Sequence, residues 1–448
     1  MFSFMLAAPS SGSGKTTLTL ALLAELKRRG LKPCAFKCGP DYIDPMLHRA
    51  VLDVPCRNLD LFLSSENYVN LSFQSSADYG AAVVEAAMGF YDGLGGVSTE
   101  ASAWHVADTL KLPVVLVVRP KGASLTLAAQ IRGLTAFRDN SRIIGIILND
   151  CRESLHNILK PILEAETGLK VLGYMPHIEG ASLESRHLGL YTAGEIEDIQ
   201  SKIELLRAQA EKNIDFDTLQ KLCTIPDFEP ILKKSAVSDV RIAVARDKAF
   251  CFIYEETLEA LRNSGAELCF FSPLHDQSLP ENIGAMYLPG GYPELHAREL
   301  SGNTEMRQCI KTAIETGMPT VAECGGFLYL GASLEGADGT AYPMVGCLPG
   351  EAKNTGHLVR FGYSHIHADS DSLLFRAGDS FPVHEFHYWD SSDNGNALMS
   401  VKPGGKRSWS FGYVNQNLYA GFPHLYFAGS VLPERFTQAA RAYLRNMK

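Results

Sequence analysis

Two short segments of the chain carry residues whose types and spacing can do chemistry. The first, residues 6–23, places the letters GSGKTT between an apolar run and an amphipathic pattern. A strand, a loop of small residues and a helix in this order bind phosphate, because loop N–H groups and the positive helix terminus attract its oxygens. Lys15 can reach the outer phosphates and the Thr16 hydroxyl can coordinate magnesium, although Pro9 replaces the first glycine of the usual pattern. The segment predicts nucleoside triphosphate binding, with an ordinary glycine-rich turn as the alternative, by Gly12, Ser13, Gly14, Lys15, Thr16 and Thr17.

A lysine and two carboxylates follow the second predicted strand, in the letters KCGPDYIDP. Ligands of doubly wound sheets bind beyond the carboxyl ends of the strands. Magnesium in proteins usually takes one or two carboxylates. We therefore expect Lys37 to face the phosphates of ATP, Asp41 to join Thr16 as a magnesium ligand, and Asp44 to contact the second substrate. Turn capping is the alternative role for both aspartates.

Five further polar residues lie at or beyond the ends of predicted strands in the same region. Glu85 interrupts an apolar strand, where a carboxylate is costly without a charged partner, and is predicted to be a magnesium ligand. Asp92 is predicted to contact substrate or water, with turn capping as its alternative. Asn149 ends the letters IIGIILN and is predicted to recognise the nucleotide base, or else to end the strand as a turn residue. Arg186 and His187 can bind substrate carboxylates, with a solvated loop as the alternative.

The second reactive segment, residues 319–330, reads PTVAECGGFLYL. A strand, a sharp turn and a helix with Cys324 at the turn form a nucleophile elbow in which cysteine replaces serine. The helix N-terminus favours the thiolate form, and Gly325 permits close approach of substrate. Gly290 and Gly291 end a neighbouring predicted strand, where N–H groups can form an oxyanion hole. The segment predicts acyl transfer through a thioester, with a buried structural cysteine as the alternative.

A cysteine nucleophile also needs a base. Two histidine clusters follow it in the chain: HEFH at residues 384–387 and the letters FPHLYF, which contain His424. Both clusters lie in a region after Tyr342 that is rich in strand patterns and poor in helix patterns until Pro433.

The elements that must position these residues follow an alternating pattern. Apolar runs alternate with helical segments, which is typical of parallel sheets with crossover helices. The fold class is therefore α/β, with two doubly wound domains, at 1–193 and 239–448, joined by a charged helical linker at 194–238. The predicted strands of the first domain are Phe2–Ala7, Pro33–Lys37, Ala81–Ala87, Val114–Val118, Ile143–Leu148 and Lys170–Tyr174. In the second domain we expect strands in RIAVARD, LCFFSPL, AMYLPGG and PTVAEC, with helices ending near 264 and 317.

The composition limits the classes of partner. A chain of 448 residues with 46% apolar and 20% charged residues is typical of globular proteins with substantial cores. A net charge of -9 argues against nucleic acid or an anionic membrane as the main partner. The ten cysteines include no CxxC pair, which favours a reduced compartment over a metal site. Without a long apolar run or a basic leader, we expect a cytoplasmic protein.

The motifs together resemble the cobyrinate a,c-diamide synthase family. The matching segments run in order along nearly the whole chain: APSSGSGKTT, KCGPDYIDP, EAAMGFYDG, ESRHLGL, LPGGYPE, ECGGFLYL, HEFHY and HLYF. The resemblance implies an N-terminal phosphate-loop ATPase domain, similar to dethiobiotin synthetase, and a C-terminal class I glutamine amidotransferase domain. It also implies ATP, glutamine and a tetrapyrrole carboxylate as substrates, Mg²⁺ as cofactor, and a monomer or homodimer.

By the same resemblance, Cys324 is the glutaminase nucleophile and His424 activates it. The acidic residue that usually stands two positions beyond this histidine is replaced by Tyr426, a departure that this branch of the amidotransferases shares. His424 is then left without an obvious orienting partner. His384, Glu385 and His387 are implied to position glutamine or to shape the passage of ammonia.

The resemblance implies amidation of the a- and c-acetate carboxylates of cobyrinate through acyl phosphates, in cobalamin biosynthesis. Three alternatives stay within this chemistry: a,c-diamidation of a nickel-sirohydrochlorin, a,c-diamidation of hydrogenobyrinate, and cobyric acid synthase activity. An alternative of another class is a phosphate-loop switch ATPase with an inert amidotransferase-like domain. Switch ATPases usually carry a second lysine early in the loop, where this chain has Pro9, Ser10 and Ser11.

Overall fold

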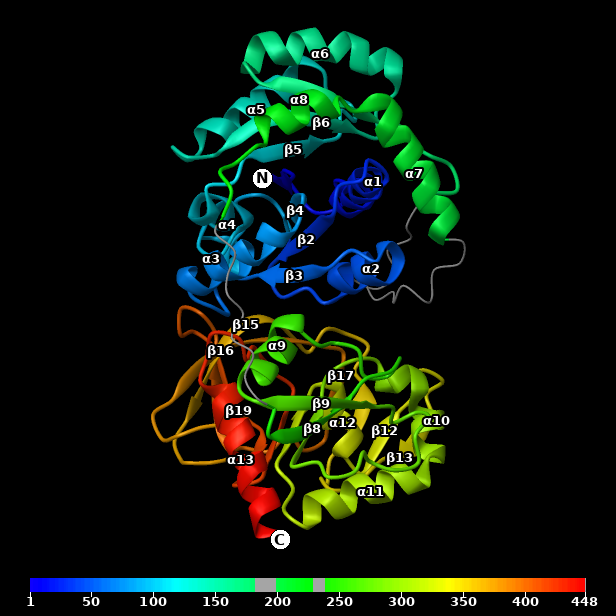
Figure 1. Ribbon diagram of the computed structural model, residues 1–448, viewed down its shortest axis with the longest axis vertical. Coiled ribbons are helices and arrows are strands. Elements are labelled where there is room, and N and C mark those ends of the chain that lie inside the picture. The colour runs from blue at the N-terminus through cyan, green and yellow to red at the C-terminus, as the bar shows by residue number, and fades with distance from the viewer. Residues whose placement is uncertain (182–198, 229–237, 448) are drawn as a thin grey trace. The chain divides into compact units, whose positions relative to one another are not determined.

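The computed structural model describes residues 1–181, 199–228 and 238–447 (Figure 1). The chain divides into two compact units, residues 1–232 and 233–448. Arg186 and His187, for which we predicted substrate contacts, lie outside the described residues. No helix in the described part of the chain is both long and apolar enough to cross a membrane.

The first unit is built on a seven-stranded, all-parallel sheet with the strand order β3-β2-β4-β1-β5-β6-β7. Six of its strands lie where the apolar runs predict them. The seventh, β3, was not predicted, because its four residues CRNL are too few and too polar to stand out as an apolar run. The strands are β1 (Phe2–Ala7), β2 (Pro33–Cys38), β3 (Cys56–Leu59), β4 (Ala81–Glu85), β5 (Val114–Val118), β6 (Ile143–Asn149) and β7 (Lys170–Met175).

Helices cover both faces of this sheet, because the strands are apolar on both sides. In β1, Phe4 and Leu6 join one core and Met5 joins the other. The first core takes side chains from α1 (Lys15–Arg28), α2 (Ile43–Leu52), α7 (Ile199–Asn213) and α8 (Phe216–Leu222). The second takes them from α3 (Glu66–Gln74), α4 (Ala103–Leu110), α5 (Leu125–Ala136) and α6 (Glu153–Thr167).

The segment that we predicted to be a helical linker is helical, but its two helices belong to the first unit. α7 lies beside α1 (Figure 1), with Ile203 and Leu206 buried in the shared core. Its Arg207 guanidinium lies 2.7 Å from the carboxylate of Glu25, which is fully buried in α1. The charged residues that weaken the sequence periodicity thus include the ion pair that docks α7. The compact unit therefore ends at residue 232 and not at the predicted 193.

The second unit has a six-stranded sheet with the order β20-β21-β11-β10-β8-β9, parallel except for β20. Its strands are β8 (Val240–Ala245), β9 (Ala266–Phe271), β10 (Ala285–Leu288), β11 (Thr320–Glu323), β20 (Tyr413–Val414) and β21 (Leu418–Gly421). The helices of the unit are α9 (Glu255–Asn263), α10 (Ala297–Gly302), α11 (Thr304–Glu315), α12 (Gly325–Leu330) and α13 (Leu432–Asn446). The prediction of two doubly wound domains is confirmed.

Two smaller sheets account for the predicted strand-rich region. One has the order β13-β12-β14-β17 and the other β19-β18-β15-β16-β22. The first comprises β12 (Ser333–Glu335), β13 (Ala341–Pro343), β14 (Glu351–Asn354) and β17 (Trp389–Ser391). The second comprises β15 (Arg360–Ala368), β16 (Ser380–His387), β18 (Leu398–Val401), β19 (Ser408–Phe411) and β22 (His424–Leu425).

Strand order decides which of the reactive segments meet. In the first unit β2, β4 and β1 are neighbours, so the loops that follow them share one edge of the sheet. In the second unit β21, β11 and β10 are neighbours, which brings together the segments that follow residues 421, 323 and 288. Both predicted sites therefore lie at the carboxyl ends of parallel strands, where this architecture binds its ligands.

Candidate functional site

The phosphate loop joins β1 to α1. Gly12 and Gly14 have φ angles of 73° and 88°, in the left-handed region that favours glycine. A Cβ atom at Gly14 would lie 2.1 Å from Nδ2 of Asn149, so a larger residue there would displace this amide as well as strain the backbone. α1 begins at Lys15 with Gly14 as its N-cap, which leaves the first N–H groups of the helix without a side-chain cap. Such a terminus is suited to bind phosphate oxygens.

Lys15 lies against the main chain on two sides. Its ammonium donates to the carbonyl of Met88, at 2.6 Å, and to the carbonyl of Ser10, at 3.2 Å. Burial and the nearby charge of Lys37 lower the pKa of Lys15 to about 8. A nearby negative charge would raise this pKa again and stabilise the ammonium, so the position favours an anionic ligand.

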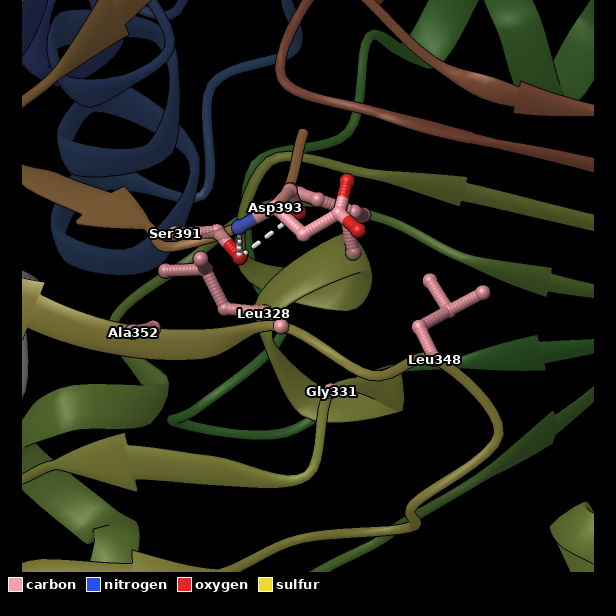
Figure 2. A pocket seen from close by; sticks show the side chains of 8 residues that line it. Leu328, Gly331, Leu348, Ala352, Ser391 and Asp393 are labelled. Atoms are coloured by element: carbon pink, nitrogen blue, oxygen red, sulfur yellow. Dashed lines mark hydrogen bonds between the residues drawn. The ribbon is translucent and has the colours of Figure 1, made fainter. Parts of the chain in front are cut away.

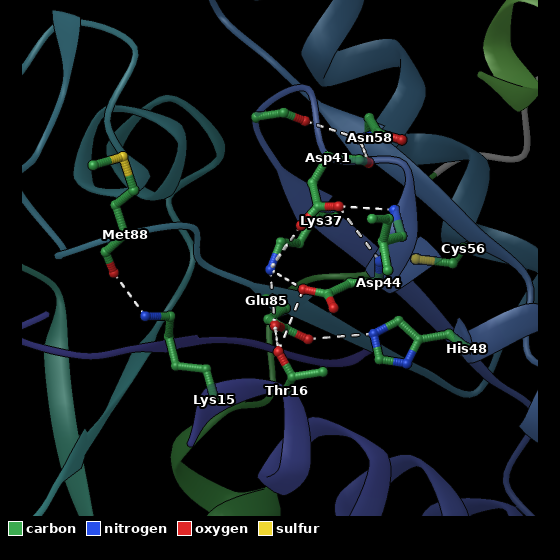
Figure 3. A network of polar contacts seen from close by, with 12 residues as sticks. Lys15, Thr16, Lys37, Asp41, Asp44, His48, Cys56, Asn58, Glu85 and Met88 are labelled. Atoms are coloured by element: carbon green, nitrogen blue, oxygen red, sulfur yellow. Dashed lines mark hydrogen bonds and ion pairs between the residues drawn. The ribbon is translucent and has the colours of Figure 1, made fainter. Parts of the chain in front are cut away.

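Thr16 and residues from β2, α2 and β4 form a polar network (Figure 3). The Thr16 hydroxyl donates to Oε1 of Glu85 at 2.6 Å and lies 3.3 Å from Oδ2 of Asp44. The Lys37 ammonium donates to the same Asp44 oxygen and, at 2.8 Å, to Oε1 of Glu85. The elements α1, β2, α2 and β4 thus place one hydroxyl, one ammonium and two carboxylates around one point.

The charges in this network are unbalanced. Burial alone raises the pKa of Glu85, but Lys37 and His48 outweigh it and hold the pKa well below its usual value. Burial and the charge of Glu85 raise the pKa of Asp44 well above its usual value, against the effect of Lys37. Asp41, Asp44 and Glu85 therefore share Lys37 as an ion-pair partner, and the site favours an additional cation.

The described residues contain no group of three or more His, Cys, Asp or Glu side chains arranged to enclose a metal ion by themselves. Magnesium does not need such an enclosure, because it keeps several waters and completes its shell with substrate phosphates. The donor set at Thr16, Glu85 and Asp44 is all oxygen, which is what magnesium prefers. The residues present therefore fit this ion.

In the second unit, Cys324 lies at a strained turn between β11 and α12. Its φ and ψ are 47° and −104°, a conformation that is rare outside glycine, and its side chain is almost fully buried. The Cys324 N–H donates to the carbonyl of Gly421 at 2.8 Å. At Gly326 a Cβ atom would lie 2.1 Å from the carbonyl of Leu288, so the helix packs too closely on β10 for any other residue. This is the geometry of a nucleophile elbow.

The end of β10 and the residue at the start of β22 lie next to this cysteine. A Cβ atom at Gly290 would lie 2.4 Å from Cε1 of His424 and 3.4 Å from Cβ of Cys324. Burial lowers the pKa of His424, but its hydrogen bond with Cys324 and the nearby Glu323 outweigh it and raise the pKa to about 10. The arrangement places a histidine base next to the thiol of the elbow cysteine, the pair that nucleophilic attack by cysteine requires.

Comparison with known proteins agrees with this geometry in both units. A family model described as "CobQ/CobB/MinD/ParA nucleotide binding domain" matches residues 4–190, and one described as "CobB/CobQ-like glutamine amidotransferase domain" matches residues 241–431. Similar curated proteins named cobyrinate a,c-diamide synthase come from Clostridium tetani, Clostridium acetobutylicum and Caldanaerobacter subterraneus subsp. tengcongensis. Their identities to this chain are 39%, 40% and 39%, over 96%, 96% and 94% of its length and 98%, 98% and 94% of theirs.

The chain belongs to the cobyrinate a,c-diamide synthase family. It is accordingly an ATP-using ligase that forms C–N bonds with glutamine as nitrogen donor. A switch ATPase with an inert second domain does not fit this membership, because the amidotransferase domain matches its family and keeps Cys324 in the elbow.

Several predicted residues of the first site make structural contacts. Oδ1 of Asp41 accepts the Ile43 N–H at 2.8 Å and so caps the start of α2, the alternative role named for it. Asp92 accepts the Gly89 N–H at 3.0 Å and closes a turn. The Asn149 amide donates to the carbonyl of Ser13 at 2.8 Å, so it holds the phosphate loop.

Two residues of this site were not predicted. His48 is fully buried in α2, and its Nε2 lies 3.3 Å from Oε2 of Glu85. Its position four residues after Asp44 puts both side chains on one face of the helix, a signal that the sequence contained. Asn58 donates to the carbonyls of Gly39 and Asp41, at 2.8 and 2.7 Å, and so fixes the loop after β2. It lies in the unpredicted strand β3, which gave no sequence signal.

The predicted HEFH cluster lies along β16, beside the cysteine site. His384 is opposite His424 in the antiparallel pairing of β16 with β22. Burial and the charges of His424 and Lys402 lower the pKa of His384 to about 3, so it is neutral. Nε2 of His387 lies 3.0 Å from Oε1 of Glu385, and its ring stacks on Phe422 at 3.7 Å between centroids.

A crevice behind α12 is filled by packing (Figure 2). Side chains from α12 and from three segments after it surround the crevice, which leaves no room for a water molecule. The Ser391 hydroxyl donates to the carbonyl of Asp393 at 2.8 Å across one side of it. This region therefore holds the elbow helix in place and is not a second ligand site. The labelled lining residues are Leu328, Gly331, Leu348, Ala352, Ser391 and Asp393.

Proposed function

We propose that this chain amidates the a- and c-acetate carboxylates of cobyrinate in cobalamin biosynthesis, with ATP and glutamine as co-substrates. Relatives that carry this activity in their name match more than nine-tenths of the chain. The observation that carries the proposal is the presence, in one chain, of an elbow cysteine facing a histidine and of a phosphate loop lined by carboxylates. The first can release ammonia, and the second can activate a carboxylate to receive it.

In the glutaminase half-reaction, the Cys324 thiolate attacks the side-chain carbonyl carbon of glutamine. Backbone N–H groups at Gly290, Gly291 and Gly325 stabilise the oxyanion. His424 gives its proton to the departing nitrogen, and ammonia leaves as the C–N bond breaks. Water then attacks the thioester, gives a proton to His424, and releases glutamate and the thiolate.

In the synthetase half-reaction, the substrate carboxylate attacks the γ-phosphorus of ATP and ADP leaves. The N–H groups of Gly12–Thr17 hold the phosphates, while Lys15 and Lys37 balance charge as the phosphoryl group transfers. Ammonia then attacks the acyl carbon, and inorganic phosphate leaves as the amide forms. The two steps repeat on the second acetate.

Magnesium would be held by the Thr16 hydroxyl with Glu85 and Asp44, and it would supply neutralisation of phosphate charge. This assignment moves the second carboxylate ligand from Asp41 to Asp44, because Asp44 approaches Thr16 while Asp41 caps α2. Asp44 then has a role in metal binding in addition to the substrate contact predicted for it.

The experiment that tests the proposed function is mass spectrometry of the products. Purified enzyme is incubated with ATP and glutamine and, in parallel, with cobyrinate, hydrogenobyrinate and nickel-sirohydrochlorin. We expect conversion of cobyrinate to the a,c-diamide, with the amide positions assigned by fragmentation. Amides on other side chains would identify a cobyric acid synthase, and preferred conversion of the nickel substrate or of hydrogenobyrinate would overturn the assignment of cobyrinate.

A further inference from the structure

We propose that Glu323, the residue directly before the nucleophile, is the acidic group that positions His424. The position where amidotransferases of this class usually carry that acid is occupied here by Tyr426. The inference rests on the proposed roles of Cys324 and His424 in glutamine hydrolysis. It adds to them the third member of the site.

The carboxylate of Glu323 is held at both of its oxygens. Oε1 accepts the N–H of Leu425, the residue after His424, at 3.0 Å. Oε2 accepts the hydroxyl of Tyr287 at 2.9 Å and lies 3.7 Å from Nδ1 of His424. The side chain is 1% exposed. A carboxylate this deeply buried is costly unless charged or polar partners face it, and these contacts supply them.

The two ring nitrogens of His424 face different groups. Nδ1 is the nitrogen near Glu323. Nε2 lies on the side of Gly290 and Cys324: a Cβ atom built on Gly290 would be 3.3 Å from Nε2 and 3.4 Å from the Cβ atom of Cys324. A carboxylate at Nδ1 keeps the proton on that nitrogen and leaves Nε2 directed at the nucleophile. The contact of 3.7 Å is an ion pair that is longer than a hydrogen bond, and such catalytic contacts tighten when substrate binds.

The packing explains why the acid comes from β11. Tyr426 is buried, and its ring contacts Tyr254 edge-on at 5.1 Å between centroids, so this position is part of an aromatic cluster. Glu323 ends β11 between β10, which supplies Tyr287, and β21, which leads into the His424 segment. The same elbow thus carries the nucleophile and the group that orients its base.

The test replaces Glu323 with glutamine in the full chain. E323Q keeps an oxygen that can accept from Leu425 or Tyr287 but removes the charge beside Nδ1. We expect kcat for glutamine hydrolysis to fall about 10²-fold, with KM little changed and ammonium-dependent amidation unchanged. Glu323 stabilises the imidazolium form of His424, so its loss should lower the pKa of this histidine. In a plot of the rate of Cys324 alkylation by iodoacetamide against pH, we therefore expect the high-pH limb of E323Q to lie at lower pH than that of the wild type.

The groups that face His424 in this titration are Cys324 and Glu323 from the elbow and the neutral His384 from β16. Two controls separate positioning from stability. Y287F removes one donor to Glu323 but keeps the carboxylate, and should change kcat less than tenfold. E256Q replaces another buried glutamate of this unit, in α9, and its alkylation profile should be the same as that of the wild type.

Wild-type hydrolysis and an unshifted alkylation profile in folded E323Q would overturn the inference. If E323Q does not fold, E323D supplies the test: it keeps the charge on a shorter side chain and should retain more activity than E323A. Equal activity of E323D and E323A would also overturn the inference. Glutamine hydrolysis that survives in C324A would instead overturn the proposed function itself.

Discussion

The phosphate site of the first unit and the cysteine site of the second use the same scaffold in different ways. Both lie at the carboxyl edge of a parallel sheet, and in both a glycine-containing turn leads into a helix. The first site gathers its groups from one helix and two strands, as the network of Thr16 in α1, Lys37 in β2 and Glu85 in β4 shows. The second places its nucleophile and an acid on consecutive residues, Glu323 and Cys324.

This difference follows from the chemistry. Phosphoryl transfer needs many charges spread around a large polyanion, and positioning is most of the catalysis. Thiol attack on a carboxamide needs one activated atom and one base at fixed distance. The strained φ of 47° at Cys324 therefore belongs to the second site, whereas the turn of the phosphate loop itself uses Gly12 and Gly14 at its positive φ angles.

The largest effect that separates the two sites is expected from C324A. Glutamine-dependent amidation should fall about 10⁴-fold or more, because the thioester cannot form. Amidation with an ammonium salt should continue at the wild-type rate, since the phosphate site is untouched. Product formation with each nitrogen source, measured by mass spectrometry, checks this. Loss of both activities would place Cys324 in the synthetase chemistry or in folding.

The K15A substitution tests the phosphate site of the first unit. Amidation should fall about 10³-fold with glutamine and with ammonium alike, because the charge that faces the outer phosphates is gone. Glutamine hydrolysis by Cys324 should persist. Parallel assays of phosphate release and glutamate release measure the two halves separately. Ammonium-dependent synthesis at the wild-type level in K15A would contradict the assigned role.

G290A sharpens the comparison at the cysteine site. The new methyl group would stand 2.4 Å from Cε1 of His424, so the imidazole must move away from Cys324. We expect kcat for glutamine hydrolysis to fall about 10²-fold while ammonium-dependent synthesis remains. G302A is the matched control, because a Cβ atom there meets nothing within 4 Å. An active G290A enzyme would contradict the close placement of these groups.

The smallest effect is expected from N58A at the phosphate site. The substitution removes two hydrogen bonds to the loop after β2 and should lower the free energy of unfolding by about 2 kcal/mol. It should also raise KM for ATP a few-fold. Urea denaturation measures the first effect and steady-state kinetics the second. N70A, which removes an exposed bond within α3, should stay within about 0.5 kcal/mol of wild type.

The sequence by itself determined the two reactive loops and the strands that lead into them. Both loops depend on local requirements: Gly14 must adopt a left-handed φ, and Cys324 must end a strand and begin a helix. Such requirements involve neighbouring residues and are visible as short motifs. The family resemblance rests on the same segments, and for this reason the family and fold class were predicted correctly.

Only the tertiary structure decided which distant groups meet at these loops. Strand order brings Asp44 and His48 to Thr16 and Glu85, while Asp41 caps a helix. Packing of helix on helix docks α7 on α1, although the sequence of this segment predicted a linker. The spacing of Asp44 and His48 shows only that they share one face of a helix; the contacts themselves depend on the packing of whole elements, which the chain does not reveal locally. The clearest case is Glu323: its spacing matches no motif, and only the folding of β22 onto β16 and β11 puts His424 beside it.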